Sequence, residues 1–287
     1  MPAPEDRRYE HRFHAGNVGD VLKHTALTAL LAALPPGPKR LIETHAGAGA
    51  HPLGATGEWT EGIGRLWSLD LSRAPGIVER YLREVEASTR RRRGSTELAG
   101  GSYPGSPLIF ASMRGEHDRL VLHEIAGEAR AALTARFADA PWVEILGEDG
   151  LAALSALSSR AQEEIVVLID PPYADRREWI DVARAIIAAH GRAPAARMML
   201  WYPIKSYARP NALLGELERA QITAATVELI TTPLTSQKNR LNGSGVLFVS
   251  PAEGLVEEMA ACAAWLGPRL ATQAGRWSTR CVGFGGR

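Results

Sequence analysis

Short apolar runs along this chain alternate with segments whose apolar residues recur at helical spacing. The apolar runs predict buried strands at 39–45, 118–124, 142–147, 165–169 and 197–201. Helical spacing follows the later runs and predicts helices at about 126–137, 177–190 and 207–220, and another that ends near 158. Alternation of this kind produces a parallel sheet with helices on both faces. We therefore expect a doubly wound, Rossmann-like α/β fold.

The last part of the pattern departs from strict alternation. Strands predicted at 222–231 and 245–250 follow each other without a helix between them. Mostly parallel sheets commonly end in an antiparallel strand, so we expect an antiparallel edge here. An amphipathic segment at 254–265 is expected to cover this end of the sheet.

Two segments lie outside the strand–helix alternation. Residues 1–34 predict a polar N-terminal arm and a helix, which Asn17 can cap. Residues 52–104 are rich in Gly and Trp near their start and then become helical, which predicts a small helical insertion. With no second set of alternating elements, we expect one domain over 1–287.

Composition narrows the function classes only a little. The formal net charge of +1 provides no global attraction for nucleic acid, so a nucleic-acid surface would have to be local. The two cysteines, Cys262 and Cys281, lack metal-ligand spacing, and we expect no metal. No window resembles a membrane span or a signal peptide, so the sequence predicts a soluble, cytoplasmic protein without a membrane partner.

Basic residues gather locally in two places. The stretch 191–210 contains Arg192, Arg197, Lys205 and Arg209 and no acid, which favours contact with phosphates; Lys238 and Arg240 in a later loop extend this prediction. The other place is the run Arg90 to Arg93 inside the insertion. Such a run is more typical of a solvated helix end than of a nucleic-acid contact.

The run 165–169 is the reference point for the candidate chemistry. It ends at Asp170, which is followed by Pro171, Pro172 and Tyr173. Prolines cannot continue a strand ladder, so they hold the carboxylate and the aromatic ring in a rigid extended turn. In open α/β sheets, ligands bind beyond the carboxyl ends of the strands, which is where this turn lies.

Other strand ends place polar and small residues at the same edge. Gly47 and Gly49 follow the first strand, where small residues let a ligand approach the backbone; alone, they equally fit a tight surface turn. Glu124 follows the second strand, where an acid can bind ribose hydroxyls. Asp149 follows the third and can accept a hydrogen bond from an adenine amine. Together these residues predict a site for an adenosine-containing cofactor.

The Asp170 turn suits an exocyclic amine. The nitrogen lone pair of such an amine is delocalised into its ring or carbonyl, which makes it a poor nucleophile. The Asp170 carboxylate and the Pro171 carbonyl can accept both amine hydrogens and favour the reactive, pyramidal geometry. Tyr173 can stack on the ring plane, a contact that contributes roughly 1–3 kcal/mol per base.

These residues resemble a known family. The Asp-Pro-Pro-Tyr turn resembles the fourth motif of class I, S-adenosylmethionine-dependent amino-methyltransferases, and the chain as a whole resembles the bacterial 23S ribosomal RNA adenine-N6 methyltransferases of the RlmJ type. The similar blocks, in order over nearly the whole chain, are Phe13-His14-Ala15-Gly16-Asn17, Asp20-Val21-Leu22-Lys23-His24, Thr44-His45-Ala46-Gly47-Ala48-Gly49, Tyr103-Pro104-Gly105-Ser106-Pro107-Leu108-Ile109, Asp170-Pro171-Pro172-Tyr173 and Trp201-Tyr202-Pro203.

The resemblance implies a Rossmann-like methyltransferase domain with a helical insertion. By motif position it implies that Asp170 is catalytic and that Tyr9 touches the RNA. It also implies that the cofactor S-adenosyl-L-methionine contacts His24, His45, Ser106, Glu124, Asp149, Gly150 and Asp170. Two positions depart from the family's pattern, since Glu43 stands where an Asp is typical and His51 follows the glycine loop in place of a basic-aromatic pair.

We therefore expect methyl transfer to N6 of one adenine of 23S rRNA, flipped out of its stack or already unpaired, by a monomeric enzyme. Substrate contacts are expected from Tyr9, Pro171, Pro172, Tyr173, Lys205 and Arg209. The alternatives are a DNA adenine-N6 or protein-glutamine methyltransferase, and a non-catalytic RNA-binding relative. The absence of a separate target-recognition region counts against a sequence-specific DNA enzyme.

Overall fold

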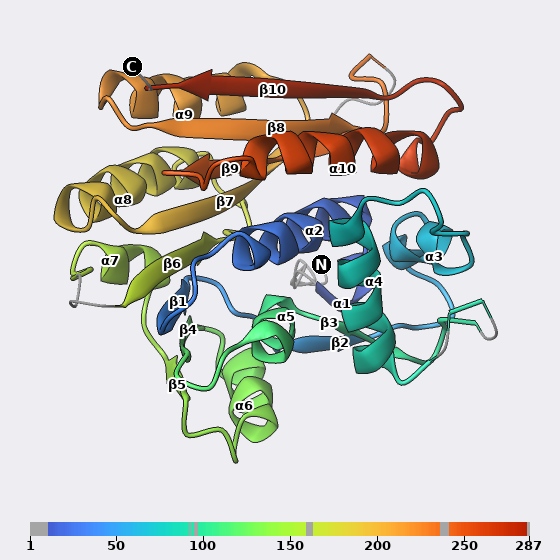
Figure 1. Ribbon diagram of the computed structural model, residues 1–287, viewed down its shortest axis with the longest axis horizontal. Coiled ribbons are helices and arrows are strands. Elements are labelled where there is room, and N and C mark those ends of the chain that lie inside the picture. The colour runs from blue at the N-terminus through green and yellow to red at the C-terminus, as the bar shows by residue number, and fades with distance from the viewer. Residues whose placement is uncertain (1–10, 92, 95–96, 159–162, 236–240, 286–287) are drawn as a thin grey trace, which may run out of the picture.

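The computed structural model describes residues 11–91, 93–94, 97–158, 163–235 and 241–285. The described residues form an 8-stranded sheet with the strand order β10-β8-β9-β7-β6-β1-β4-β5 (Figure 1). Its strands are β1 (Lys39–Glu43), β4 (Arg119–His123), β5 (Val143–Leu146), β6 (Glu164–Ile169), β7 (Arg197–Ile204), β8 (Ala224–Ile230), β9 (Gly243–Val249) and β10 (Ser278–Phe284).

The parallel half of the sheet contains β5, β4, β1, β6 and β7, in that spatial order. Numbered along the chain, these strands have the order 3-2-1-4-5 of a doubly wound dinucleotide-binding sheet. The direction of winding reverses between β1 and β6, so the crevice where such folds bind ligands opens between the ends of these two strands. The predicted Rossmann-like α/β class is confirmed.

The antiparallel half differs in one respect from the expectation. β9 lies between β7 and β8 and is antiparallel to both, which confirms the predicted antiparallel edge. Beyond β8 the sheet gains β10, antiparallel to β8, which the apolar pattern did not reveal. Residues of β10 are only exposed or half-buried, so this strand contains no apolar run that could have predicted it.

Helices cover both faces of the sheet. One core cluster joins the sheet to α2 (Val18–Ala32), α4 (Gly76–Thr89), α5 (Ser106–Met113) and α10 (Leu255–Leu270). The other joins it to α7 (Gly150–Leu154), α8 (Glu178–Arg192) and α9 (Ala208–Arg219), while α6 (Gly127–Arg136) packs beside β5. Alternate residues of β6 enter opposite clusters, because successive side chains of a strand point to opposite faces.

The helix α2 is buried along most of its length, and Figure 1 shows it in front of the sheet. It begins as expected, since the Asn17 side chain accepts a hydrogen bond from the Asp20 backbone N–H at 3.0 Å. Its buried residues include three ionisable ones, Asp20, Lys23 and His24. Buried polar groups need specific partners, so we expect these three side chains to do more than pack α2 against the sheet.

Between β1 and α5 the chain leaves the sheet. Strand β2 (Ala50–Pro52) pairs antiparallel with β3 (Ser102–Pro104), and this pair closes a segment containing η1 (Glu58–Thr60), α3 (Ile63–Trp67) and α4. The short helix α1 (His11–His14) lies against η1 and β2. α4 packs against α2 and α5, and its buried residues include Tyr81. The closing strands β2 and β3 fall at the edges of 52–104, where only helix was expected.

Candidate active site

Backbone hydrogen bonds join the carboxyl ends of the parallel strands. The Thr44 N–H donates to the Leu168 carbonyl at 3.0 Å, which ties the β1 loop to β6. The Ala46 N–H donates to the His123 carbonyl at 3.0 Å, and the Glu124 N–H donates to the Leu146 carbonyl at 3.0 Å. The loops after β1, β4, β5 and β6 therefore form one continuous edge around the crevice.

Glu124 and the glycine loop hold each other in place. One carboxylate oxygen of Glu124 accepts the Gly47 N–H at 2.8 Å, and the other accepts the Ala126 N–H at 2.7 Å. Gly47 has a φ of 62°, and a Cβ there would meet open space. A Cβ on Gly49, at φ 76°, would come within 2.8 Å of the Leu133 side chain. The loop therefore leaves open space at Gly47 and packs tightly at Gly49.

Glu43 is fully buried at the end of β1. The Ser106 hydroxyl, at the first residue of α5, donates to its Oε1, while Oε2 is buried and has no hydrogen-bond partner in the described chain. Burial raises the pKa of Glu43 to about 8; Ser106 and Lys23 oppose this rise, and the charges of Asp170 and Glu124 add to it. The end of β1 thus contains a buried carboxyl oxygen that lacks a partner among the described residues.

Asp149 and Gly150 form the start of α7. Oδ1 of Asp149 accepts the N–H groups of Leu151 at 2.9 Å and Ala152 at 3.3 Å, so this acid is the helix cap. A Cβ on Gly150 would lie 2.4 Å from the Thr44 carbonyl oxygen, so only glycine lets α7 approach the β1 loop this closely.

The two candidate histidines have different surroundings. His45 follows β1 and its Nδ1 lies 2.8 Å from the Thr44 hydroxyl. Burial lowers its pKa, although Asp170, Asp149, Glu124 and Glu178 oppose this shift.

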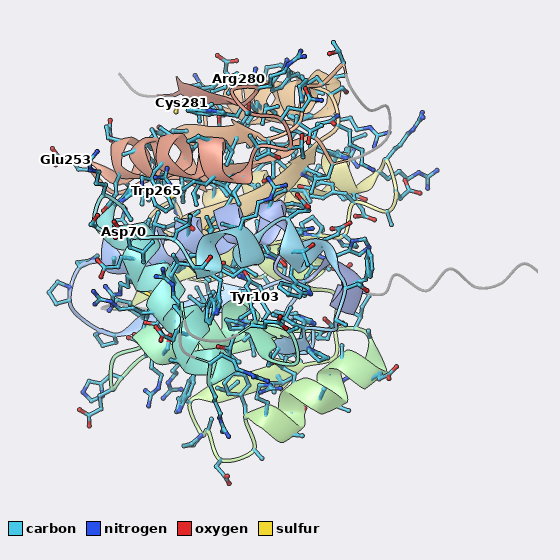
Figure 2. The ribbon with its side chains drawn as sticks, turned by 90° about the vertical axis from the view of Figure 1, so that its right-hand side faces the viewer. Asp70, Tyr103, Glu253, Trp265, Arg280 and Cys281 are labelled. Atoms are coloured by element: carbon cyan, nitrogen blue, oxygen red, sulfur yellow. The ribbon has the colours of Figure 1, made fainter. Side chains whose placement is uncertain are left out.

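His24 lies on α2, buried against the insertion. Its Nδ1 lies 2.8 Å from the Tyr103 hydroxyl, and the two rings stack with centroids 5.4 Å apart. The Tyr103 hydroxyl is also 2.9 Å from that of Tyr81 on α4, and Figure 2 shows Tyr103 in the interior of the molecule. The position of His24 therefore depends on the insertion as well as on α2.

Asp170 is paired with a residue that the sequence analysis did not assign to the site. The Lys23 ammonium lies 2.6 Å from Oδ2 of Asp170 and 2.7 Å from Oδ1 of Asp20. The other oxygen of Asp20 accepts the Gly16 N–H at 2.9 Å. Lys23 lies three residues after Asp20 on a helix whose buried residues are mostly apolar. A charged residue there conflicts with the apolar pattern, and this conflict could have identified Lys23 as a site residue.

The surroundings of Lys23 hold its charge. Its side chain is 7% exposed and that of Asp170 is 15% exposed. Burial by itself would lower the lysine pKa, but the charges of Asp170 and Asp20 outweigh burial and raise the pKa well above its usual value. The Trp201 ring lies 6.0 Å from the ammonium and covers the start of α2 at Gly19.

The turn after Asp170 is held in a conformation that is uncommon for tyrosine. Tyr173 has a φ of 51°, in the left-handed region. Its hydroxyl donates to the Trp201 carbonyl at 3.1 Å, and its ring packs against Trp179 with centroids 4.4 Å apart. Pro171 is buried and Pro172 is exposed. The ring is therefore fixed between the ends of β6 and β7.

The predicted basic stretch 191–210 does not form one surface. Arg197 begins β7 and bonds to Glu164 and to the Ser250 carbonyl, so it ties strands together at the amino edge of the sheet. Lys205 follows the carboxyl end of the strand, roughly 25 Å further on at about 3.3 Å per residue. Lys205 and Arg209 are both exposed at the carboxyl edge. Tyr9, Lys238 and Arg240 lie outside the described residues.

Among the described residues, no group of three His, Cys, Asp or Glu side chains is arranged to hold a metal ion. No described helix is long and apolar enough to cross a membrane.

Comparisons with known proteins find similar chains. Two curated proteins named "Ribosomal RNA large subunit methyltransferase J" are similar to the chain. The Escherichia coli protein is 32% identical over 91% of this chain and 93% of its own, and the Haemophilus influenzae protein is 30% identical over 96% and 98%. The crystal structure of a Legionella pneumophila protein has a TM-score of 0.82 at 26% identity, covering 94% of this chain and 98% of its own.

A family model matches residues 37–282, which include all strands of the sheet except the last part of β10. Its description is "Ribosomal RNA large subunit methyltransferase D, RlmJ". The match covers most of the chain, and the similarity to the two curated relatives extends over nearly all of it. The chain therefore belongs to the RlmJ family of ribosomal RNA large subunit methyltransferases.

Proposed function

We propose that this protein transfers a methyl group from S-adenosyl-L-methionine to N6 of one adenine in 23S ribosomal RNA. The observation that supports this best is the Asp170 carboxylate, held by Lys23 at the end of β6 and followed by the fixed Tyr173 ring. This arrangement suits a planar amine, and the names of both curated relatives indicate ribosomal RNA as the substrate.

The residues around the crevice fit the proposed cofactor. S-adenosyl-L-methionine has ribose hydroxyls and an amino-acid group that form hydrogen bonds, and the buried Oε2 of Glu43 is a polar atom without a partner in the described chain. The open space at Gly47 leaves room for a ligand beside the backbone. We propose that the residues that hold the cofactor are His24, His45, Gly47, Gly49, Ser106, Glu124, Asp149, Gly150 and Asp170.

The cap role of Asp149 is compatible with a ligand contact. Only Oδ1 accepts the helix N–H groups, so Oδ2 can accept a hydrogen bond from an adenine amine. Glu124 likewise uses each oxygen once, and each oxygen has a further lone pair for a ribose hydroxyl. Both acids are therefore oriented by the backbone before a ligand arrives.

The mechanism follows from how Asp170 is held. When bound, S-adenosyl-L-methionine would supply an electrophilic methyl carbon to the adenine nitrogen, and the thioether S-adenosyl-L-homocysteine would be the leaving group. Lys23 holds Oδ2 of Asp170, so we assign Oδ1 as the acceptor for one amine hydrogen and the Pro171 carbonyl as the acceptor for the other. These bonds withdraw the nitrogen lone pair from the ring and favour attack. Positioning supplies most of the rate enhancement, and the carboxylate accepts the proton that the product amine loses.

The substrate residues lie around the same opening. We propose that Tyr173 stacks on the flipped base, while Pro171 and Pro172 keep the turn rigid. Lys205 and Arg209, exposed just beyond β7, are placed to meet phosphates near the target base. Tyr9 is assigned to the RNA from the family motif alone. We further propose that 1–287 acts as one methyltransferase domain, as a monomer in the cytoplasm, with 1–34 and 52–104 as its arm with helix and its insertion.

The test uses transcribed 23S rRNA, purified protein and labelled S-adenosyl-L-methionine, with nucleosides identified by mass spectrometry. We expect N6-methyladenosine from the wild type. Asp170→Asn should lower the rate at least about 10²-fold, because the amide cannot act as the proton acceptor. Asp139→Asn, the same change on an exposed loop residue, should match the wild type. The proposal fails if label enters DNA or glutamine side chains instead of rRNA, or if Asp170→Asn retains full rate.

A further inference from the structure

The arginine run of the insertion is divided by the structure. Arg93 is directed into the protein, where its guanidinium donates to the Trp67 carbonyl at 3.3 Å and to the Leu69 carbonyl at 2.8 Å. Arg93 therefore joins α3 to the end of α4. Arg90 is the C-cap residue of α4; it is exposed and adopts a left-handed conformation with φ 55°. Arg90 and Arg93 thus lie in different environments, and Arg92 lies outside the described residues.

Arg90 lines a cavity together with an arginine from a distant part of the chain. The cavity measures about 380 Å³ and is bordered by Arg90, by Arg136 of α6 and by the hydroxyl residues Ser88, Thr89 and Ser102. Gly100 and Gly101 also line it, and the Arg91 guanidinium lies beside Gly100. Residues 46 positions apart in the sequence thus meet at one opening between the insertion and α6.

The chemistry of this basic pocket is that of an anion site. No acid is among the described residues that line it, and neither Arg90 nor Arg136 forms an ion pair within the described chain. A guanidinium presents a planar fork of N–H donors that matches two phosphate oxygens, and the Ser88 and Ser102 hydroxyls add further donors, while the Thr89 hydroxyl donates to the Glu86 carbonyl. By contrast, two acids, Glu144 and Glu163, line the cavity at the amino edge of the sheet, and Glu163 forms an ion pair with Arg40 at 3.3 Å.

The basic pocket adjoins the glycine loop without being part of the crevice. Ala50, which follows Gly49, lines it, and the Arg136 side chain packs behind Gly49, within 3.3 Å of where a Cβ would stand. Strands β2 and β3 connect the pocket to the loop. The sugar–phosphate backbone of an RNA whose target base enters the crevice from this edge would run past the insertion.

We propose that this basic pocket binds a backbone phosphate of the RNA substrate, as a second contact outside the catalytic crevice. This inference rests on the proposed function, because it takes the substrate to be RNA. A contact to phosphate positions the RNA without selecting sequence. The phosphate contact gives a role to Arg90 and Arg136, to which the proposed catalysis assigns none.

The experiment measures binding of transcribed 23S rRNA between 50 and 200 mM salt, together with methylation kinetics. Arg90→Gln combined with Arg136→Gln should weaken RNA binding about tenfold at low salt. The slope of log K against log salt should become shallower by roughly 0.7 to 0.9 for each lost phosphate contact. The kcat at saturating RNA and the S-adenosyl-L-methionine affinity from calorimetry should remain within about twofold of the wild type, since neither arginine is assigned a contact in the crevice.

Matched variants make the result specific. Arg119→Gln removes the same charge from an exposed arginine at the opposite edge of the sheet and should leave the slope unchanged. Arg136→Lys keeps the packing behind Gly49 and should retain most of the affinity. If the double variant does not fold, Arg136→Glu on the exposed face of α6 should produce a larger RNA-binding defect by itself.

Three outcomes would overturn the inference while leaving the proposed function intact. The first is an unchanged salt slope in the double variant, with wild-type methylation of rRNA. The second is an equal loss in Arg119→Gln, which would indicate a general charge effect. The third is a defect seen only on assembled ribosomal particles and not on naked RNA, which would assign the pocket to a protein partner. Failure of the wild type to methylate rRNA would instead contradict the proposed function.

Discussion

Replacing Lys23 with Met isolates the contribution of the buried charge cluster. One ammonium lies 2.6 Å from Asp170 and 2.7 Å from Asp20. At an effective dielectric constant of about 20, each contact corresponds to an attraction of about 6 kcal/mol, much of which is offset by desolvation. Methionine has a similar length and no charge, so it leaves two carboxylates close together and without their common partner.

The net effect on stability is set by the unpaired charges. Removing one partner of a buried ion pair costs about 3–5 kcal/mol, and we expect Lys23→Met to lower the free energy of unfolding by about this amount. Urea denaturation of the purified protein measures it. Activity should fall further, by about 10² or more in kcat, because nothing then holds Oδ2 of Asp170 in position.

A second variant separates the two effects. Adding Asp20→Asn to Lys23→Met removes one of the unpaired carboxylates, so the double variant should regain part of the lost stability while its kcat stays low. The S-adenosyl-L-methionine affinity, measured by calorimetry, serves as the check that the crevice is intact. Wild-type kcat in a folded Lys23→Met protein would refute the view that this lysine positions Asp170.

Two further predictions concern the β1 loop. The folded protein retains a proton on Glu43 that the unfolded chain releases, so stability should fall as the pH rises from about 4.5 to about 8, and Glu43→Gln should lessen this fall; urea midpoints across that range measure it, and equal slopes for the two proteins would contradict it. Gly150→Ala should lower stability by about 1–3 kcal/mol and weaken cofactor binding, because its Cβ would overlap the Thr44 carbonyl; unchanged melting and calorimetry would contradict it.

Much of the fold could be predicted from local pattern. Strands buried on both faces, such as β6, need apolar residues at every position, and the resulting continuous apolar run is visible in the sequence. Strand β10 could not be found in this way. Within the described chain it pairs with β8 alone and stays half-exposed, so its sequence carries no apolar run, and its place is decided by pairing with the edge of β8.

For the candidate site too, the local sequence determined some features and the tertiary packing determined the others. The chain by itself determined which residue types follow each strand, and therefore that acids, glycines and the Asp170 turn share one edge, because all parallel strands end on the same side. Only the tertiary structure decided that Lys23 of α2 reaches Asp170, that Arg197 and Lys205 lie at opposite edges, and that Arg90 and Arg136 meet across a cavity. These contacts depend on how helices pack over the sheet, and sequence spacing along one element carries no information about a partner on another.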